Sequence, residues 1–281
     1  MGIYDTPLRY PGGKSRIAYH IASIISKNDF IQYCEPMVGG GSVFLAVMKL
    51  LGKYKQYWIN DINQSLVAFW LALRDYNDEL ITAIQNLIQK SLADPRETFY
   101  DLRKANCDNI IQEAARFYFL NKASFSGVTL SGGFSISSYK DKLLKSDLSR
   151  LRKYKYLLDN VKITSLDFQD VISNLPDKSI IFLDPPYFSN KKSKLYGKEG
   201  ALHVNFDHDR LKLVLDNTKN KWLMTYDDAS EIRMKYSAYN IFSFNVQYYM
   251  NGGAKNKNEI LISNFLIDFE KDSKLIINNL V

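Results

Sequence analysis

Cysteine, histidine and long apolar runs are scarce in this sequence of 281 residues. The two cysteines, Cys34 and Cys107, stand far apart and form no Cys-x-x-Cys, which excludes a disulfide framework and a cysteine zinc site. The three histidines form no ligand pattern, so we expect no metal ion. The first residues lack the apolar core of a signal peptide, and no run approaches the roughly 20 apolar residues of a membrane span. We therefore expect a cytoplasmic protein without a membrane partner.

Acidic residues are outnumbered by basic ones, 30 against 37, and the excess lies in two short stretches. Residues 140–155 hold seven cations and two anions, and residues 191–198 hold four cations and no anion. A near-neutral body with two basic patches favours a polyanionic partner, of which nucleic acid is the commonest. Solvated lysine-rich faces are the alternative that charge alone leaves open.

Apolar runs of strand length alternate with segments of helical periodicity, which predicts an α/β fold with a Rossmann-like, mostly parallel sheet. The last two runs are joined by residues 251–258, a connection too short for a crossover helix, which predicts a C-terminal antiparallel hairpin. The expected strands lie at residues 31–34, 57–59, 161–164, 180–183, 222–225, 242–249 and 259–265.

The middle of the chain, residues 64–155, has mainly helical periodicity. We therefore expect an inserted helical domain that divides an α/β domain into two parts, residues 1–63 and 156–281. Asp94 followed by Pro95 is typical of a helix start within this block.

Two segments near the end of the helical block differ from the rest. Residues 124–139 contain two β-prone runs around a Ser-Gly-Gly, which predicts a hairpin or a flexible loop. Residues 140–158 read as a basic amphipathic helix with cations on one face. The expected apolar stripe of this helix consists of Leu144, Leu148, Leu151, Tyr154 and Leu158.

A glycine-rich motif, Glu35-Pro-Met-Val-Gly-Gly-Gly-Ser42, follows the first expected strand and opens a helix. Its glycines, including Gly39 and Gly41, let a ligand approach the backbone, and the helix N-terminus offers unpaired N–H groups. Asp61 ends the second strand at the spacing of an acid that binds the ribose hydroxyls of a nucleoside. Phe44 at the third glycine position of the dinucleotide motif disfavours NAD. The motif predicts a nucleoside site, with a plain tight turn as the alternative.

The segment Arg9-Tyr-Pro-Gly-Gly-Lys-Ser-Arg16 is similar to the end of a phosphate-binding P-loop. Leu8 stands where a P-loop requires glycine, and no strand precedes it, which excludes a P-loop ATPase. Tyr10 and Lys14 remain candidates for contacts to an adenine ring and a carboxylate, and an ordinary helix start is the alternative.

A motif of four residues, Asp184, Pro185, Pro186 and Tyr187, ends the very apolar run 180–183. The prolines hold φ near about −65° and lack N–H donors, so the carbonyls of Asp184 and Pro185 point in a set direction. A carboxylate and a rigid carbonyl can accept the two N–H groups of an exocyclic amine, while Tyr187 stacks on its flat ring. We therefore expect these four residues to be catalytic, at the carboxyl edge of the sheet where such folds bind ligands.

Four motifs in this order, Pro-Gly-Gly-Lys, Glu-Pro-x-x-Gly-Gly-Gly-Ser, Asn-Asp-x-Asn and Asp-Pro-Pro-Tyr, resemble the DNA adenine methylase type of DNA methyltransferase. The resemblance implies transfer of a methyl group from S-adenosylmethionine to N6 of adenine in duplex DNA. It also implies a Rossmann-like methyltransferase sheet with a helical target-recognition domain. With the glycine motif, it implies cofactor contacts at Tyr10, Lys14, Gly39, Gly41, Asp61, Asp167, Phe168 and Asp184.

The segment Asn121-Lys-Ala-Ser-Phe-Ser-Gly127 resembles the family's recognition segment. Thr129 and Leu130 stand where members that recognise GATC carry arginine, the commonest reader of guanine, so GATC specificity is not expected. We expect a monomer, with a weak dimer on DNA as the alternative. DNA contacts are expected from Asn121, Ser126, Gly127, Lys140, Lys142, Arg150, Lys191 and Lys192.

Two other functions remain open at this point. A methyltransferase for cytosine N4, RNA or a glutamine amide would need the same Asp-Pro-Pro-Tyr chemistry. A DNA-binding module that has lost catalysis would keep the fold, although the intact Asp61, Asp184 and Tyr187 argue against it.

Overall fold

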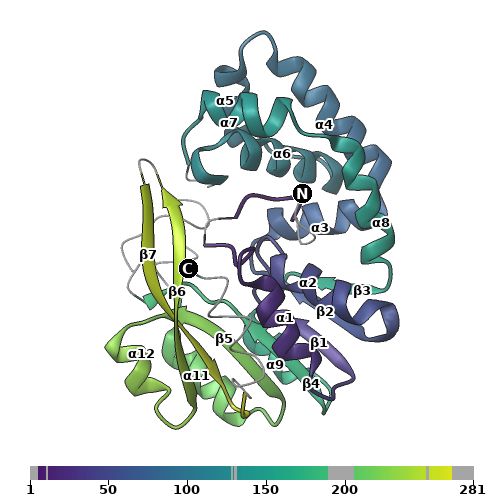
Figure 1. Cartoon of the computed structure of the whole chain (residues 1–281). Helices are drawn as coiled ribbons and strands as arrows, with labels where there is room; N and C mark the ends of the chain where they lie inside the picture. Colours follow the sequence, from purple (N-terminus) through teal and green to yellow (C-terminus); the bar gives the residue numbers. More distant parts are fainter. Residues whose placement is uncertain are drawn as a thin grey trace.

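The computed structural model describes residues 6–10, 12–127, 129, 132–188, 206–250 and 253–267. Its centre is one seven-stranded sheet with the order β3-β2-β1-β4-β5-β7-β6 (Figure 1). The predicted α/β fold with a mostly parallel sheet is confirmed. The five parallel strands are β1 (Gln32–Glu35), β2 (Gln56–Asn60), β3 (Val161–Thr164), β4 (Ser179–Leu183) and β5 (Lys221–Asp227).

The predicted C-terminal antiparallel hairpin is confirmed and is longer than expected. It consists of β6 (Asn240–Met250) and β7 (Gly253–Ser263), so most of the connection expected at residues 251–258 belongs to a strand. The polar sequence there suggests a turn, but pairing with β6 makes these residues a strand without apolar alternation. Only residues 259–263 of β7 pair with β5, so the outer half of the hairpin extends past the carboxyl ends of the parallel strands.

Strand β4 is buried on both faces, which explains why its sequence is apolar throughout rather than alternating. Ile180 and Phe182 pack with helices on one face, whereas Ile181 and Leu183 pack with helices on the other. With both faces covered, the carboxyl edge of the sheet is where a ligand can bind. The covering helices are α1 (Ala18–Ser26) and α2 (Ser42–Leu51) on one face, and α9 (Phe168–Ser173), α11 (His208–Asn217) and α12 (Ser230–Lys235) on the other.

The predicted helical block follows β2 and precedes β3 in the sequence. Its helices α4 (Asn77–Ser91) to α7 (Ile136–Ser138) lie above the sheet in Figure 1. Asp94 Oδ1 accepts the N–H groups of Arg96 at 2.9 Å and Glu97 at 2.8 Å, so the expected helix start at Pro95 is confirmed. Within the described part of the chain, no helix is long and apolar enough to cross a membrane. The main helices are α3 (Gln64–Asp75), α4 (Asn77–Ser91), α5 (Pro95–Lys104), α6 (Ile110–Ala123) and α8 (Arg152–Leu158).

In the hairpin or loop predicted at residues 124–139, the described residues form one antiparallel bridge, between Ser124 and Phe134. The 3-10 helix η2 (Phe125–Gly127) follows Ser124, and the short helix α7 (Ile136–Ser138) follows the bridge. Serine side chains offer local hydrogen bonds to the backbone that compete with a strand ladder. The segment is therefore a compact loop closed by one bridge.

The basic helix predicted over residues 140–158 is interrupted at Asp147, whose side chain caps a new short helix. The first piece is a π-helix, whose wider turn brings Leu143 rather than Leu144 into the core. Leu144 is 39% exposed, so its predicted place in the apolar stripe is wrong, whereas the later members of the stripe are buried. The pieces are η3 (Tyr139–Leu144), η4 (Leu148–Leu151) and α8.

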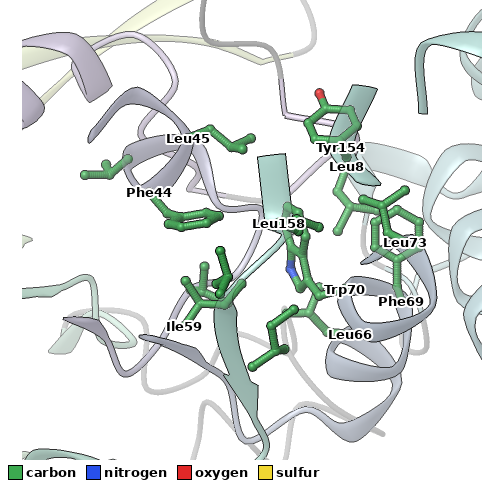
Figure 2. Packing of buried hydrophobic residues seen from close by; sticks show 14 of the residues in the cluster. Leu8, Phe44, Leu45, Ile59, Leu66, Phe69, Trp70, Leu73, Tyr154 and Leu158 are labelled. Carbon is green, nitrogen blue, oxygen red and sulfur yellow. The ribbon is translucent and has the colours of Figure 1, made fainter. Parts of the chain in front are cut away.

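One apolar cluster joins the sheet to the helical block (Figure 2). Trp70 of α3 is fully buried in this cluster, together with Phe44, Ile59 and Leu158. Its indole N–H donates to the carbonyl of Gly39 at 3.2 Å, which ties the helical block to the loop after β1. Truncation of a buried tryptophan typically costs about 3–5 kcal/mol. The sequence segments on either side of residue 63 therefore share a core.

Candidate functional site

The residues expected to bind cofactor gather at the carboxyl edge of the parallel sheet. The glycine loop (residues 36–41) follows β1, and Asp61, Asp167 and Asp184 follow β2, β3 and β4 in the same way. The segment before α1 reaches this edge as well, because its Lys14 contacts Asp184. Parallel strands all end at one edge, so the topology unites residues that lie far apart in the sequence.

Asp184 is held by two side chains from opposite ends of the chain. Lys14 Nζ donates to Asp184 Oδ2 and to the carbonyl of Gly12, each at 2.8 Å, and its ion-pair distance to Asp184 Oδ1 is also 2.8 Å. Thr225 Oγ1 on β5 donates to Asp184 Oδ1 at 2.8 Å. Thr225 was not predicted as a site residue. The one feature in the sequence that could have indicated it is its hydroxyl group at the end of an apolar run. A carboxylate has about four acceptor positions, so the two hydrogen bonds from Lys14 and Thr225 leave room for a further donor.

Tyr187 stacks on a second aromatic ring at the site. Its ring centroid lies 6.0 Å from that of Tyr226, with an interplanar angle of 24°. Lys14 Nζ lies 4.9 Å from the centroid of the Tyr187 ring. Directly after the motif, the N–H of Phe188 donates to Asp227 Oδ1 at 2.9 Å. Contacts from β5 therefore order the Asp-Pro-Pro-Tyr turn at its end as well as at Asp184.

The glycine loop packs against Tyr10. A Cβ at Gly39 would lie 2.8 Å from Tyr10 Cε1, and one at Gly40 would lie 2.9 Å from Tyr10 Cβ. Gly39 and Gly41 also have φ values of 49° and 70°, which favour glycine. The loop thus requires glycine for the chain's own packing. A cavity of about 340 Å³ beside it is lined by Thr6, Leu8, Arg9, Tyr10, Gly13, Ser15, Gly40 and Ser42.

Asp61 is buried at the carboxyl end of β2. Its Oδ2 accepts the N–H of Gly39 and its Oδ1 accepts the N–H of Asn63, both at 3.0 Å. Burial raises the pKa of Asp61 to about 6, and the two backbone hydrogen bonds oppose that rise. The carboxylate form, with acceptor positions left over, suits the two hydroxyls of a ribose.

Asn60 ties together the loops that follow three strands. Its Nδ2 donates to the carbonyls of Pro36 and Leu166, and its Oδ1 accepts from Thr164 Oγ1 and the N–H of Leu166, all at 2.8–2.9 Å. Leu166 and Ile62 are 41% and 51% exposed at this edge. An exposed apolar side chain is therefore adjacent in sequence to each of two acids: Leu166 to Asp167, and Ile62 to Asp61.

Asp167 and Phe168 begin α9 and are covered by a cation that the sequence reasoning missed. Asp167 Oδ1 caps the helix by accepting the N–H of Gln169 at 2.9 Å, and Oδ2 accepts from Arg210 Nη2 at 2.8 Å. The guanidinium of Arg210 lies 4.5 Å from the centroid of Phe168, whose ring is 5.6 Å from that of Phe206. This group of a cation and two aromatic rings can pack against a flat ring.

Glu35 ends β1 and is fully buried beside the site. Burial raises its pKa to about 8, and the nearby charge of Asp184 acts in the same direction. A hydrogen bond from the Tyr33 hydroxyl and one from the N–H of Phe44 act in the opposite direction. The carboxyl of Glu35 is therefore mostly protonated at neutral pH, and it is Asp184 that forms the ion pair with Lys14.

Asn121, expected to contact DNA, is instead fully buried and bound to main-chain atoms. Its Oδ1 accepts the N–H of Arg9 at 2.9 Å, and its Nδ2 donates to the carbonyls of Arg9 at 2.6 Å and Gly127 at 3.1 Å. A side-chain amide with both Nδ2 donors engaged and no exposed surface does not meet a DNA strand. The expectation for Asn121 is therefore wrong, because the motif serves packing at this position.

Cations expected to contact DNA lie on the helical block. Lys140 and Lys142 are exposed on η3, and Arg150 is half-buried on η4. Because these three cations lie on two short helices, they do not form the single basic stripe that one continuous helix would present. The side chain of Ser126 and the whole of Lys191 and Lys192 lie outside the described part of the structure, so these expected contacts stay predictions.

A further lysine, Lys122, lies near two other cations beside the recognition segment (residues 121–127). Burial lowers the pKa of Lys122 to about 8, and the charges of Arg9 and Lys142 act in the same direction. Its ammonium lies 5.3 Å from the centroid of the Tyr118 ring. Three cations close enough to repel one another create a local positive potential that suits a polyanion.

Comparison with known proteins agrees with this geometry. The profile of the D12 class N6 adenine-specific DNA methyltransferases matches residues 10–250. The type II methyltransferase M.MjaIII of Methanocaldococcus jannaschii is 28% identical over 260 residues, 86% of each chain. The type II methyltransferase M.CviBI of Paramecium bursaria Chlorella virus NC1A is 27% identical over 239 residues, 83% of this chain and 86% of that protein. The chain belongs to the D12 class of N6 adenine-specific DNA methyltransferases, which transfer a methyl group from S-adenosylmethionine to adenine in DNA.

Proposed function

We propose that the motif from Asp184 to Tyr187 carries out this methyl transfer, and that the chain is the modification enzyme of a type II restriction-modification pair. The observation that carries the first proposal is the support of Asp184 by Lys14 and Thr225, which leaves acceptor capacity on the carboxylate at the carboxyl edge of the sheet. The similarity to two type II methyltransferases supports the second.

The target adenine must leave the duplex before it reaches this motif, at a cost of roughly a few kcal/mol in stacking and pairing. Stacking of Tyr187 on the flipped base offsets part of that cost. Asp184 and the Pro185 carbonyl then accept the two N–H groups of the amine and orient its lone pair. The charge of Asp184 also stabilises the positive charge that develops on nitrogen. S-adenosylmethionine, when bound, would supply the electrophilic methyl group and leave as S-adenosylhomocysteine, and the methylated nitrogen would lose one proton to become a neutral amine.

The cofactor fits the groups that surround the other strand ends. Asp61 offers buried carboxylate oxygens to ribose hydroxyls, and Phe168 offers an aromatic ring to adenine. Tyr10 and the glycine loop line the 340 Å³ cavity, with Gly40 and Ser42 at the start of α2 where an anionic group is favoured. Lys14, with its donors on Asp184 and Gly12, serves the cofactor site by fixing Asp184.

We assign the DNA-facing surface to the helical block, with Lys140, Lys142 and Arg150 as phosphate contacts that position the protein without reading sequence. The cations Arg9 and Lys122 support this assignment, because they add positive charge at the recognition segment. A target other than GATC and a monomeric enzyme stay predictions. Sedimentation with and without a DNA duplex tests the second.

The decisive experiment gives the enzyme labelled S-adenosylmethionine and unmodified DNA of mixed sequence, and maps N6-methyladenine by sequencing. Wild type should modify adenine within one short sequence. Asp184→Asn keeps the size of the side chain but loses its charge, and should lower kcat by roughly 10²–10³-fold, the usual effect of removing one preorganised group. Asp228→Asn is the matched control, because this acid near the same edge is bonded to Arg233 instead.

Three outcomes would contradict the proposal. DNA binding without any modified base would identify an inactive DNA-binding module. Modification of cytosine N4 instead of adenine would show that the motif serves another planar amine. Full activity of a folded Asp184→Asn variant would remove Asp184 from catalysis.

A further inference from the structure

The side chain of Asn121 fixes the main chain of a residue 112 positions earlier in the sequence. Both main-chain groups of Arg9 bind the same amide: its N–H donates to Oδ1 at 2.9 Å, and its carbonyl accepts from Nδ2 at 2.6 Å. The second donor of Nδ2 reaches the carbonyl of Gly127 at 3.1 Å. Asn121 therefore holds the segment before α1 and the end of the recognition segment in one position relative to each other.

Gly127 contacts the same residue from a different direction. A Cβ at Gly127 would lie 2.5 Å from the carbonyl oxygen of Arg9, an atom of the backbone that cannot rotate away. The φ of Gly127 is 76°, a value that other L-residues rarely adopt. Its neighbour in the loop, Gly133, has nothing within 4 Å of such a Cβ. The close approach between the two segments is thus specific to Gly127.

The residues that follow Arg9 line the proposed cofactor cavity, and one of them, Lys14, contacts Asp184. Arg9, Tyr10 and Gly13 all line the cavity, and the N–H of Gly13 donates to the carbonyl of Tyr10 at 3.0 Å to close a turn. Lys14 follows, with its ammonium on Asp184. A shift of the Arg9 backbone would therefore change the cavity wall and the support of the catalytic carboxylate.

We propose that Asn121 is a positioning residue through which the recognition segment sets the affinity of the site for S-adenosylmethionine. The inference rests on the proposed function, because it takes the cavity beside Tyr10 as part of the cofactor site. According to this inference, the buried amide of Asn121 in the helical block affects the binding of S-adenosylmethionine without touching it. By linkage, a bound cofactor must stabilise the held arrangement by the same factor.

The test measures the Kd for S-adenosylmethionine by calorimetry in the absence of DNA, on full-length wild type and two variants. Asn121→Ala removes the amide, and Gly127→Ala pushes a methyl group against the Arg9 carbonyl. Each should weaken cofactor binding by about tenfold, or ~1.4 kcal/mol. Gly133→Ala is the matched control in the same loop and should stay within twofold of wild type. Circular dichroism and thermal melting show whether each variant is folded.

Hydrogen exchange on the wild type keeps the inference testable if a variant fails to fold. Saturating S-adenosylmethionine without DNA should slow exchange of the amides of residues 121–127. Unchanged exchange there, or a cofactor Kd within twofold of wild type in both folded variants, would overturn the inference. If the wild-type enzyme methylates adenine and one of these two results is found, only the inference about Asn121 is refuted. If the wild-type enzyme transfers no methyl group, the proposed function itself is refuted.

Discussion

Replacement of Glu35 by glutamine should stabilise the enzyme, and the gain should depend on pH. Glu35 is fully buried, and its pKa of about 8 lies far above the ordinary 4.5. The native state therefore keeps a proton that the unfolded chain releases between these two values. Because the native state binds more protons in that window, stability of the wild type falls as pH rises from about 4.5 to about 8 and changes little from this group outside it.

The size of the effect follows from the two pKa values. Each pKa unit corresponds to about 1.4 kcal/mol, so between pH 5 and pH 7 Glu35 should remove about 2–3 kcal/mol from the free energy of unfolding. Glutamine has nearly the same shape as the protonated acid and can still accept the hydrogen bond of the Tyr33 hydroxyl. Glu35→Gln should therefore match wild type near pH 4.5 and exceed it by about 3 kcal/mol at pH 7.

Urea unfolding followed by tryptophan fluorescence at several pH values measures this difference directly. The difference between variant and wild type isolates Glu35, because other groups with raised pKa values, such as Asp61, are present in both proteins. A difference that stays flat between pH 5 and pH 8 would refute the reasoning. Cofactor is left out of these measurements, so that ligand binding does not contribute.

Glu113 offers a control of opposite sign. Burial alone would raise its pKa, but the hydrogen bond from Arg116 Nη2 at 2.7 Å and other contacts lower it. The unfolded state then binds more protons than the native state, so this group contributes stability at neutral pH that is lost as pH falls through its folded pKa. Glu113→Gln should accordingly destabilise the enzyme at pH 7, with a smaller cost in acid.

Gly41→Ala should destabilise the fold by about 2 kcal/mol or more, because φ is 70° and the new methyl group would lie 2.8 Å from Trp70 Cζ2; a urea midpoint equal to wild type would contradict this. Cofactor affinity should rise as pH increases through about 6, where Asp61 ionises, and calorimetry from pH 5 to 8 checks that rise against a flat profile in Asp61→Asn. Lys142→Gln and Arg150→Gln should each reduce the salt dependence of DNA binding by about 0.9 in log Kd against log salt, measured by fluorescence anisotropy, and an unchanged slope would exclude a phosphate contact.

The strand-end residues of the site could be predicted because two simple rules apply to them. Apolar runs that alternate with helical periodicity indicate parallel strands, and parallel strands end at one edge. Asp61, Asp167 and Asp184 each directly follow such a run or lie a few residues beyond it. Their convergence needs no knowledge of how side chains pack.

The residues that hold this site in place could not be predicted in the same way. Thr225, Arg210 and Asn121 act on partners that are 41, 43 and 112 positions away in the sequence. Each is an ordinary polar residue locally, and its role depends on which backbone or side chain the fold brings beside it. Asn121 was assigned to DNA for this reason, since its motif was visible but its burial was not.

The local backbone conformation of two segments could not be predicted from the sequence either. The shift of Leu143 into the core depends on a π-helical turn, a rare local geometry that the apolar spacing of a regular helix does not indicate. The strand character of residues 253–258 arises because β6 supplies a partner for them, despite their glycine, asparagine and lysine content. In both cases tertiary contacts decided the local structure.

These long-range contacts have a consequence for how the site forms. Asp184 binds a lysine 170 positions before it and a threonine 41 positions after it, so neither neighbour comes from the adjacent sequence. The segment that carries the lysine is itself held by Asn121 in the helical block. The carboxylate of Asp184 therefore reaches its final orientation only after the sheet, the helical block and β5 have all assembled. Substitutions that disturb only these polar contacts should lower kcat before they lower the amount of folded enzyme, because the apolar cluster that joins the sheet and the helical block stays intact.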